Sequence, residues 1–139
     1  MTVFPETWLR NRLPDESQTF DRREVDSVEI DLPMPPSVNA LFANKPGKGR
    51  IKTKAYKAWL EEAGLILNCQ RPGRIAGRYS IHIQVRRLPK MSDLANREKA
   101  TSDLLVRHGV IEDDSLAERV TLEWSDSILG ARVLVERAA

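Results

Sequence analysis

Residues 90–115, KMSDLANREKATSDLLVRHGVIEDDS, place acidic side chains at both ends of a predicted helix. Asp93 stands where the helical pattern begins, and Asp113 and Asp114 follow the short apolar run after it. At about 100° per residue, several positions of this stretch share one side of the helix. They are Asp93, Asn96, Ala100 and Asp103, with Lys99 at the edge.

This arrangement suits a metal ion. Mg²⁺ prefers carboxylate oxygens, usually one or two per ion, with water and phosphate completing its octahedron. Lys99 could hold a phosphate or stabilise developing negative charge. A simpler explanation stays open, because Asp93 could merely cap the helix and residues 112–114 could form a solvated loop.

The length and composition limit the class of protein. The chain has 139 residues, which fits one domain with a real core, and 41% hydrophobic with 30% charged residues is a globular profile. No apolar run approaches the roughly 20 residues of a membrane span, and no signal-peptide pattern is visible, so we expect a cytoplasmic protein without membrane contact. One cysteine, Cys69, excludes an internal disulfide and a cysteine-based zinc cluster.

The net charge of +2 hides a strong asymmetry along the chain. Residues 45–57 and 71–90 each contain six basic residues and no acid, whereas residues 91–126 contain nine acids and four bases. A polyanion could be held by the basic stretches while a metal lies among the acids. The alternative is that the basic residues are simply solvated.

The hydrophobic pattern predicts an α+β single domain with the order β-α-β-α-β-β, in which a small mixed sheet packs on two helices. We expect strands at 27–32, 79–88, 117–124 and 131–137, and helices at about 53–68 and 94–108. The last two strands predict an antiparallel hairpin, and residues 44–52 a flexible loop. Residues 1–26 are expected to form a partly ordered N-terminal extension, and residues 27–139 the domain.

Three separated motifs now combine: LPMPPSVN after the first strand, SDLANREKATSDLL on the second helix, and GVIEDDS after it. Together, over about residues 28–136, they resemble the RusA family of Holliday-junction resolvases. The resemblance implies a RusA-like fold and a homodimeric, Mg²⁺-dependent endodeoxyribonuclease. Such an enzyme would nick four-way or other branched DNA in recombination, repair or phage DNA processing.

The resemblance also implies roles for individual residues. Asp93, Lys99, Asp113 and Asp114 match the catalytic positions, and the three aspartates would bind Mg²⁺ or Mn²⁺. Asn39, Asn96 and Asp103 match positions that support the site. We expect contacts to the DNA backbone from the basic stretches, and we expect the strand at 79–88 to carry its two arginines towards the acids. The proposed DNA-binding residues are Lys45, Lys48, Arg50, Lys52, Lys54, Lys57, Arg86, Arg87 and Lys90.

One position departs from the family pattern. Ala95 stands where the family has a second aspartate, and a methyl group cannot bind Mg²⁺. Three explanations are open: Glu112 or Asp103 supplies the missing oxygen, the chain is an engineered inactive variant, or it binds DNA without strong cleavage. The last of these is the alternative function, a RusA-like dimer that binds branched or duplex DNA.

Overall fold

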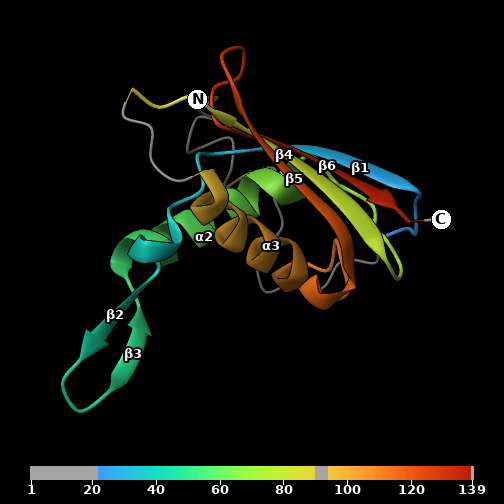
Figure 1. Cartoon of the computed structure of the whole chain (residues 1–139). Helices are drawn as coiled ribbons and strands as arrows, with labels where there is room; N and C mark the ends of the chain where they lie inside the picture. The colour runs from blue at the N-terminus through green and yellow to red at the C-terminus, as the bar shows by residue number, and fades with distance from the viewer. Residues whose placement is uncertain (1–21, 90–93, 139) are drawn as a thin grey trace.

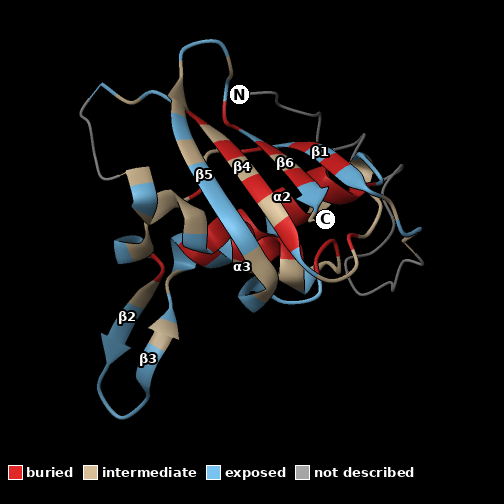
Figure 2. Ribbon diagram, turned by 45° about the vertical axis from the view of Figure 1, so that its right-hand side comes forward, coloured by how far each residue is buried: buried red, intermediate tan, exposed pale blue. Residues whose placement is uncertain are grey.

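Alternating apolar residues build the central sheet. The computed structural model describes residues 22–89 and 94–138. Strand β1 (Ser27–Leu32) buries every second residue, as do β4 (Tyr79–Arg86) and β6 (Ala131–Arg137). The helices α2 (Lys54–Cys69) and α3 (Glu98–Arg107) lie on one face of this sheet (Figure 1). Residues of the sheet and of both helices are buried (Figure 2) and form one hydrophobic core. The predicted α+β class and the mixed sheet on two helices are therefore confirmed.

The strand order is β1-β6-β4-β5, which corrects one prediction. Strand β5 (Ala117–Ser125) pairs with β4, in parallel, whereas β6 lies between β1 and β4 and is antiparallel to both. The predicted hairpin of the last two strands is wrong. The short turn signal between β5 and β6 does not fix their partners, because the β4-α3-β5 crossover places β5 on one side of β4 and leaves the other side to β6.

Both helices have well-defined ends. Helix α2 (Lys54–Cys69) starts at the predicted cap, where Thr53 Oγ1 accepts the Tyr56 amide at 3.2 Å. Helix α3 (Glu98–Arg107) follows a 3₁₀ turn, η2 (Leu94–Arg97). It ends at Gly109, whose φ of 72° permits the left-handed turn, while the Val110 amide donates to the Leu105 carbonyl at 2.9 Å.

A second, two-stranded sheet replaces the flexible loop that the sequence predicts. Strands β2 (Phe42–Lys45) and β3 (Gly49–Lys52) pair as a hairpin that projects from the body of the domain (Figure 1). The glycines allow the tight turn, because Gly47 and Gly49 both adopt positive φ. We call residues 42–52 the basic hairpin. It adds two strands to the predicted element order.

Proline-rich residues 33–36 run between β1 and a 3₁₀ turn, η1 (Val38–Ala40). The indole of Trp59 donates to the Pro33 carbonyl at 3.3 Å, and Arg97 donates to the Pro35 carbonyl at 2.9 Å. These bonds tie the segment to both α2 and η2. The proline-rich segment is therefore held against η2, the turn that leads into helix α3.

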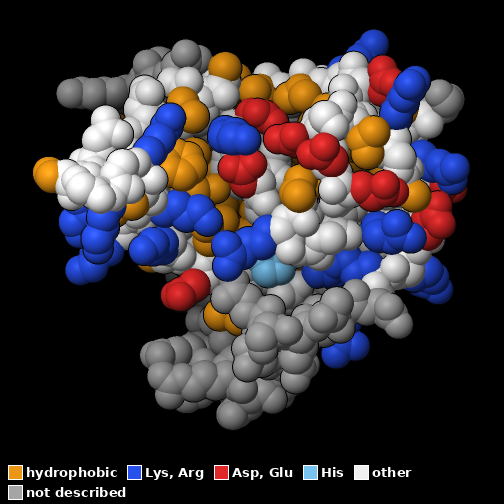
Figure 3. Space-filling model, turned by 90° about the horizontal axis from the view of Figure 1, so that it is seen from below, with side chains coloured by type: hydrophobic (Ala, Val, Ile, Leu, Met, Phe, Trp, Pro, Cys, Tyr) orange, Lys and Arg blue, Asp and Glu red, His pale blue; other side chains and the backbone are white. Residues whose placement is uncertain are grey.

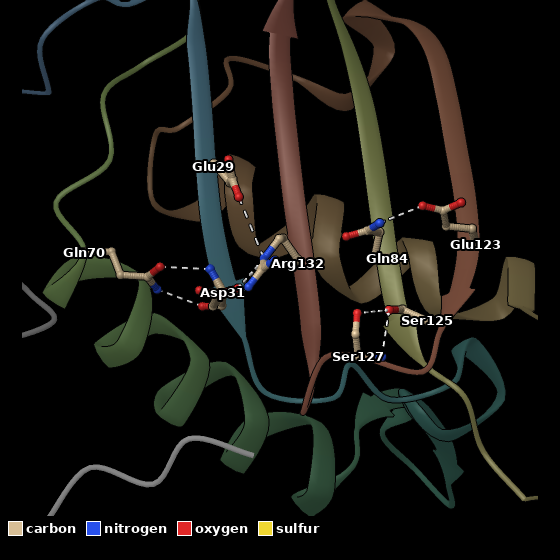
Figure 4. Close-up of polar contacts among 8 residues, drawn as sticks. All are labelled: Glu29, Asp31, Gln70, Gln84, Glu123, Ser125, Ser127 and Arg132. Carbon is tan, nitrogen blue, oxygen red and sulfur yellow. Dashed lines mark hydrogen bonds and ion pairs between the residues drawn. The ribbon is translucent and has the colours of Figure 1, made fainter.

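The outer face of the sheet is polar (Figure 4). Arg132 on β6 lies between two acids of β1, with its Nε 3.0 Å from Asp31 Oδ1 and 3.8 Å from Glu29 Oε1. The Gln70 side chain accepts the Asp31 amide at 2.8 Å and donates to the Asp31 carbonyl at 2.7 Å. Gln70 thus covers the open edge of β1 much as a neighbouring strand would.

Residues 22–26 also contact the domain. Arg22 donates to the His108 carbonyl at 2.7 Å and to the Pro72 carbonyl at 3.1 Å, and the Val25 amide donates to the Arg74 carbonyl at 2.9 Å. The predicted domain boundary at residue 27 stays a prediction, because residues 1–21 lie outside the described residues. Within the described ranges, no helix is long and apolar enough to cross a membrane.

Candidate nucleic-acid and metal site

The chain after α3 forms an acidic turn, residues 112–115. Asp113 precedes a short 3₁₀ turn, η3 (Asp114–Leu116), and its Oδ2 accepts the Ser115 hydroxyl at 2.7 Å. The hydrogen bond from Ser115 is the main reason that the pKa of the Asp113 carboxyl lies below its usual value. Both aspartates are exposed, so their carboxylates are accessible to a ligand.

Lys99 connects helix α3 to the acidic turn. Its Nζ lies 3.0 Å from Asp103 Oδ1 and 3.6 Å from Asp114 Oδ2. The hydrogen bond to Asp103 raises the pKa of Lys99 above its usual value, with further contributions from both negative charges. The structure therefore brings together three of the residues that the sequence singles out.

Asp103 is held from the other side by helix α2. Its Oδ2 accepts the Tyr56 hydroxyl at 3.2 Å. Burial, followed by the charge and hydrogen bond of Asp103, raises the pKa of Tyr56 to about 12, so the phenol stays a hydrogen-bond donor. With Lys99 and Tyr56 as partners, Asp103 lies where a supporting residue of the site is expected, while its function stays a prediction.

A groove of about 340 Å³ lies between the acidic turn and the basic hairpin. We call it the acid groove. Its lining combines acids with aromatic and basic side chains: Asp103, Asp113, Asp114, Phe42, Tyr56, Lys52 and Arg107, with Leu60 and Val106. Figure 3 shows acidic side chains gathered on one face of the molecule, with basic side chains on either side of them.

Two further polar residues were not predicted from the sequence. Tyr79 opens β4 opposite Ala117, directly after η3, and its side chain is fully buried. Its hydroxyl has no hydrogen-bond partner among the described residues. Burial raises the pKa of Tyr79 to about 12, and the charges of Asp114, Glu98 and Asp113 add to this effect in that order.

Glu98 is the second such residue. It is half-buried in the first turn of α3, and its Oε1 accepts the hydroxyl of buried Ser102. In the sequence, Glu98 looks like an ordinary acid in a first helical turn, where the helix dipole favours it. Tyr79 looks like an apolar member of an alternating strand. Only the fold shows that the charge of Glu98 contributes to the raised pKa of Tyr79.

The remaining candidate ligands have other contacts. Glu112 Oε1 accepts the Gly77 amide at 3.0 Å and lies 3.7 Å from Arg74 Nη1, so this side chain is held against the turn before β4. Asp93 and Lys90 lie outside the described residues. Within the parts of the chain that the structure describes, no three His, Cys, Asp or Glu side chains form a metal cluster.

The described residues nonetheless fit a hard divalent cation such as Mg²⁺. Asp113 and Asp114 offer accessible carboxylates, and Mg²⁺ needs only one or two of them. The Tyr79 hydroxyl is a buried donor without a partner among the described residues, and such a group normally has one. Asp113 and Asp114 stay the predicted ligands, together with Asp93, which lies outside the described residues.

The predicted supporting residues Asn39 and Asn96 lie in turns beside the start of α3, the end of the helix that also carries Lys99. Asn39 is in η1, where its backbone amide donates a hydrogen bond to Ser37 Oγ at 3.4 Å. Asn96 is half-buried in η2. The turns η1 and η2 are in contact with one another, and η1 also contacts α3. Their assignment to the site stays a prediction.

The basic residues form two groups. Lys45, Lys48, Arg50 and Lys52 are exposed on the basic hairpin, and Lys54 and Lys57 are exposed on the first turns of α2. Arg86 and Arg87 are exposed at the end of β4, roughly 23 Å along the strand from Tyr79. Arg87 Nε lies 2.8 Å from Oδ1 of Asp126, at the far end of the acidic stretch 91–126, whereas Asp113 and Asp114 lie near the opposite end of β4.

Aromatic contacts stiffen the base of the basic hairpin. The guanidinium of Arg50 lies 4.7 Å from the centroid of the Phe42 ring, and this ring meets the Tyr56 ring edge-on at 5.9 Å. The Thr53 hydroxyl also donates to the Ala40 carbonyl at 2.7 Å. The hairpin is therefore anchored directly beside the acid groove.

The basic hairpin projects beside a groove lined by carboxylates that suit a metal ion. This combination is typical of proteins that act on a polyanion such as DNA. The comparison with family models specifies the class. Residues 33–136 match the model of the endodeoxyribonuclease RusA family, so the chain belongs to this family and is an endodeoxyribonuclease for which the family implies Holliday-junction resolution. Among curated proteins, no sequence matches the chain.

Proposed function

We propose that this RusA-family nuclease cuts four-way or otherwise branched DNA at the acid groove with the help of Mg²⁺, in recombination, repair or phage DNA processing in the cytoplasm. The observation that carries the proposal is the position of Lys99, 3.0 Å from Asp103 and 3.6 Å from Asp114, at the junction of helix and acidic turn. A cation and several carboxylates around one groove suit phosphoryl chemistry better than simple DNA binding. Acids alone would repel phosphate.

Each residue has a proposed task in this reaction. When bound, Mg²⁺ polarises the scissile phosphate and favours attack by water. Asp113 and Asp114 with Asp93 hold the ion, and Lys99 contacts the phosphate or the leaving oxygen. Tyr56 keeps Asp103 in place, which in turn fixes the position of the Lys99 ammonium group.

The basic hairpin is proposed to hold the DNA backbone next to the groove. Its four exposed cations stand on one projecting element, and Lys54 and Lys57 continue the positive surface onto α2. Contacts of this type position DNA without reading its sequence. Arg86 and Arg87 would contact a different part of the DNA, because β4 separates them from the acidic turn. Lys90, outside the described residues, is proposed as a further contact to the DNA backbone.

A second copy of the chain is part of the proposal. Paired nicks on opposite strands of a four-way junction need two cutting sites, which a homodimer with two-fold symmetry supplies. Each protomer would offer one acid groove and one basic hairpin.

The test uses a labelled four-way junction and a linear duplex of the same arms, incubated with the full chain and Mg²⁺, Mn²⁺ or a chelator. We expect nicks in the junction with metal, none with chelator, and little cutting of the linear duplex. Binding of the junction without any nick under either metal would contradict the proposal. That result would support the alternative, a DNA-binding RusA relative.

A further inference from the structure

A second hollow, of about 400 Å³, adjoins the acid groove, and its interpretation rests on the proposed cutting of branched DNA. Its lining residues are Val38 of η1, Phe42 and Arg50 of the basic hairpin, and Lys99 of α3. Phe42 also lines the acid groove, so the two cavities share this ring as a wall. We call the second hollow the Phe42 pocket. Its volume lies in the range of small-ligand sites.

The Phe42 pocket combines an apolar surface with two cations. Val38 and Phe42 are half-buried and pack against the hydrophobic core. Arg50 and Lys99 are exposed, and no acid lines this pocket, in contrast to the acid groove. An apolar surface with cations beside it fits a ligand that joins a flat ring to an anion. A nucleotide has this chemistry, because its base is flat and its phosphate is charged.

The Phe42 ring and its neighbour Arg50 form a stacking surface. The Tyr56 ring meets the Phe42 ring edge-on, with 5.9 Å between the centroids, and the Arg50 guanidinium lies 4.7 Å from the Phe42 centroid. Nucleobases stack both on aromatic rings and on guanidinium groups, and such contacts tolerate any base. A base in the pocket therefore has a stacking partner that does not read the DNA sequence.

Lys99 connects the Phe42 pocket to the proposed cutting site. Its side chain lines the pocket, and its Nζ lies 3.0 Å from Asp103 Oδ1 and 3.6 Å from Asp114 Oδ2. Both of these acids line the acid groove. A nucleotide whose phosphate contacts Lys99 thus has its base within reach of Phe42.

A stacking pocket of this kind distinguishes branched from linear DNA. In a linear duplex a base must first be unstacked and unpaired, and a single aromatic contact returns only part of that cost. At a branch point the stacking of the arms is interrupted, so a base there is easier to extract. The contacts of the basic hairpin to phosphates do not supply this distinction, because both kinds of DNA offer phosphates.

We propose that the Phe42 pocket receives one unstacked base from the branch point of the DNA, next to the phosphate that is cut. Phe42 and Arg50 supply the stacking surface, and Lys99 holds the adjoining phosphate. Phe42 is thereby a residue that selects branched over linear DNA.

The first measurement uses the wild-type chain. A four-way junction carries 2-aminopurine at one branch-point position at a time, and a chelator prevents cutting. Stacking on neighbouring bases quenches the fluorescence of this base analogue. We expect binding of the chain to raise the fluorescence several-fold at one symmetric pair of positions, and to leave it unchanged in a linear duplex. Unchanged fluorescence at every branch-point position of the bound junction would overturn the inference.

A double-mutant cycle then tests whether the base contacts Phe42. Phe42→Leu keeps an apolar side chain but removes the stacking surface, and it should weaken junction affinity about 10-fold. An abasic analogue at the responsive position should weaken wild-type binding by a similar factor and leave Phe42→Leu binding unchanged, since both changes remove the same contact. Phe42→Trp should keep most of the affinity. Leu129→Ala, on the exposed turn after β5, is the control and should bind as the wild type does.

The contradicting results differ in what else they remove. Additive losses for Phe42→Leu and the abasic junction, with normal cutting of the unmodified junction, would make the inference wrong and leave the proposed function standing. A change of oligomeric state in Phe42→Leu, measured by sedimentation, would instead assign the pocket to a contact between two copies and overturn the inference. If the wild type binds the junction no better than the linear duplex and cuts neither, the proposed function fails together with the inference.

Discussion

Tyr79 carries a hydroxyl group that costs stability in the absence of metal. A buried hydroxyl without a partner is penalised by about 1–3 kcal/mol. We therefore predict that Tyr79→Phe raises the free energy of unfolding by about 1 kcal/mol, measured by chemical denaturation with a chelator present. A loss of stability would show that the hydroxyl has a partner in solution.

Lys99 is the residue proposed to contact the scissile phosphate. Lys99→Gln removes the charge that pairs with Asp103 and Asp114, and we predict that the single-turnover rate of junction cleavage falls about 10²- to 10³-fold. Junction affinity should change far less, because a single cation is removed. Arg78→Gln, on an exposed arginine that pairs with Glu118 at 3.3 Å, is the control and should cut normally.

At the scale of elements, the basic hairpin should govern the salt dependence of DNA binding. Replacing Lys45, Lys48, Arg50 and Lys52 by glutamine is expected to weaken junction affinity and to reduce the slope of log affinity against log salt. The slope should fall by about 0.9 for each phosphate that the variant no longer neutralises. Titrations at several salt concentrations measure the slope. An unchanged slope would place the DNA elsewhere, and Arg137→Gln on β6 is the control.

The end of helix α3 should make the fold sensitive to acid. Burial, with the charges of Arg22 and Arg107, lowers the pKa of His108 from 6.5 to about 4. A helix C-terminus favours a protonated imidazole, so burial and the two arginines outweigh the helix dipole here. Between pH 6.5 and 4 the unfolded chain binds the extra proton, and the stability that is present above pH 6.5 is lost as the pH falls.

The expected size is modest because His108 is partly exposed. From pH 7 to pH 5, the wild type should lose on the order of 1 kcal/mol more free energy of unfolding than His108→Gln, after allowance for solvent screening. Denaturation curves at the two pH values measure the difference. Parallel losses in the two proteins would assign the acid sensitivity to other groups.

Local patterns predicted most elements but not their partners. Alternation located β1 and β6 at their observed bounds, and Thr53 and Gly109 marked helix ends, because caps and alternation depend on neighbours in sequence. The pairing of β5 with β4 depends on a crossover, which no local signal encodes. The basic hairpin was missed because its strands are short and mostly exposed, so they show little alternation.

For the site, too, the sequence predicted the residues that are close along the chain but not those brought in from distant elements. Acids and lysine at helical spacing indicated Lys99, Asp103 and Asp114 as neighbours, since i,i+4 spacing and a short connection hold them together. The buried Tyr79 hydroxyl could not be found this way, because its environment depends on the tertiary fold and in the sequence it is one apolar position of an alternating strand.

At the scale of the whole molecule, the proposed cutting site and the proposed DNA contacts lie on different structural elements. The sheet and two helices form the body of the domain, the acid groove lies at the end of α3, and the basic hairpin projects beside it (Figure 1). A homodimer would present two such pairs to the arms of a junction. Cutting therefore depends on carboxylates that act despite the alanine at position 95.

The most direct measurement is the single-turnover rate of four-way junction cleavage with Mg²⁺ for the wild type, Asp114→Asn and Ala95→Asp. We predict that the wild type cuts, that Asp114→Asn loses at least about 100-fold, and that Ala95→Asp cuts as well, because it keeps the carboxylates of the acidic turn. A wild type that binds the junction without cutting it, together with cutting by Ala95→Asp, would contradict this mechanism.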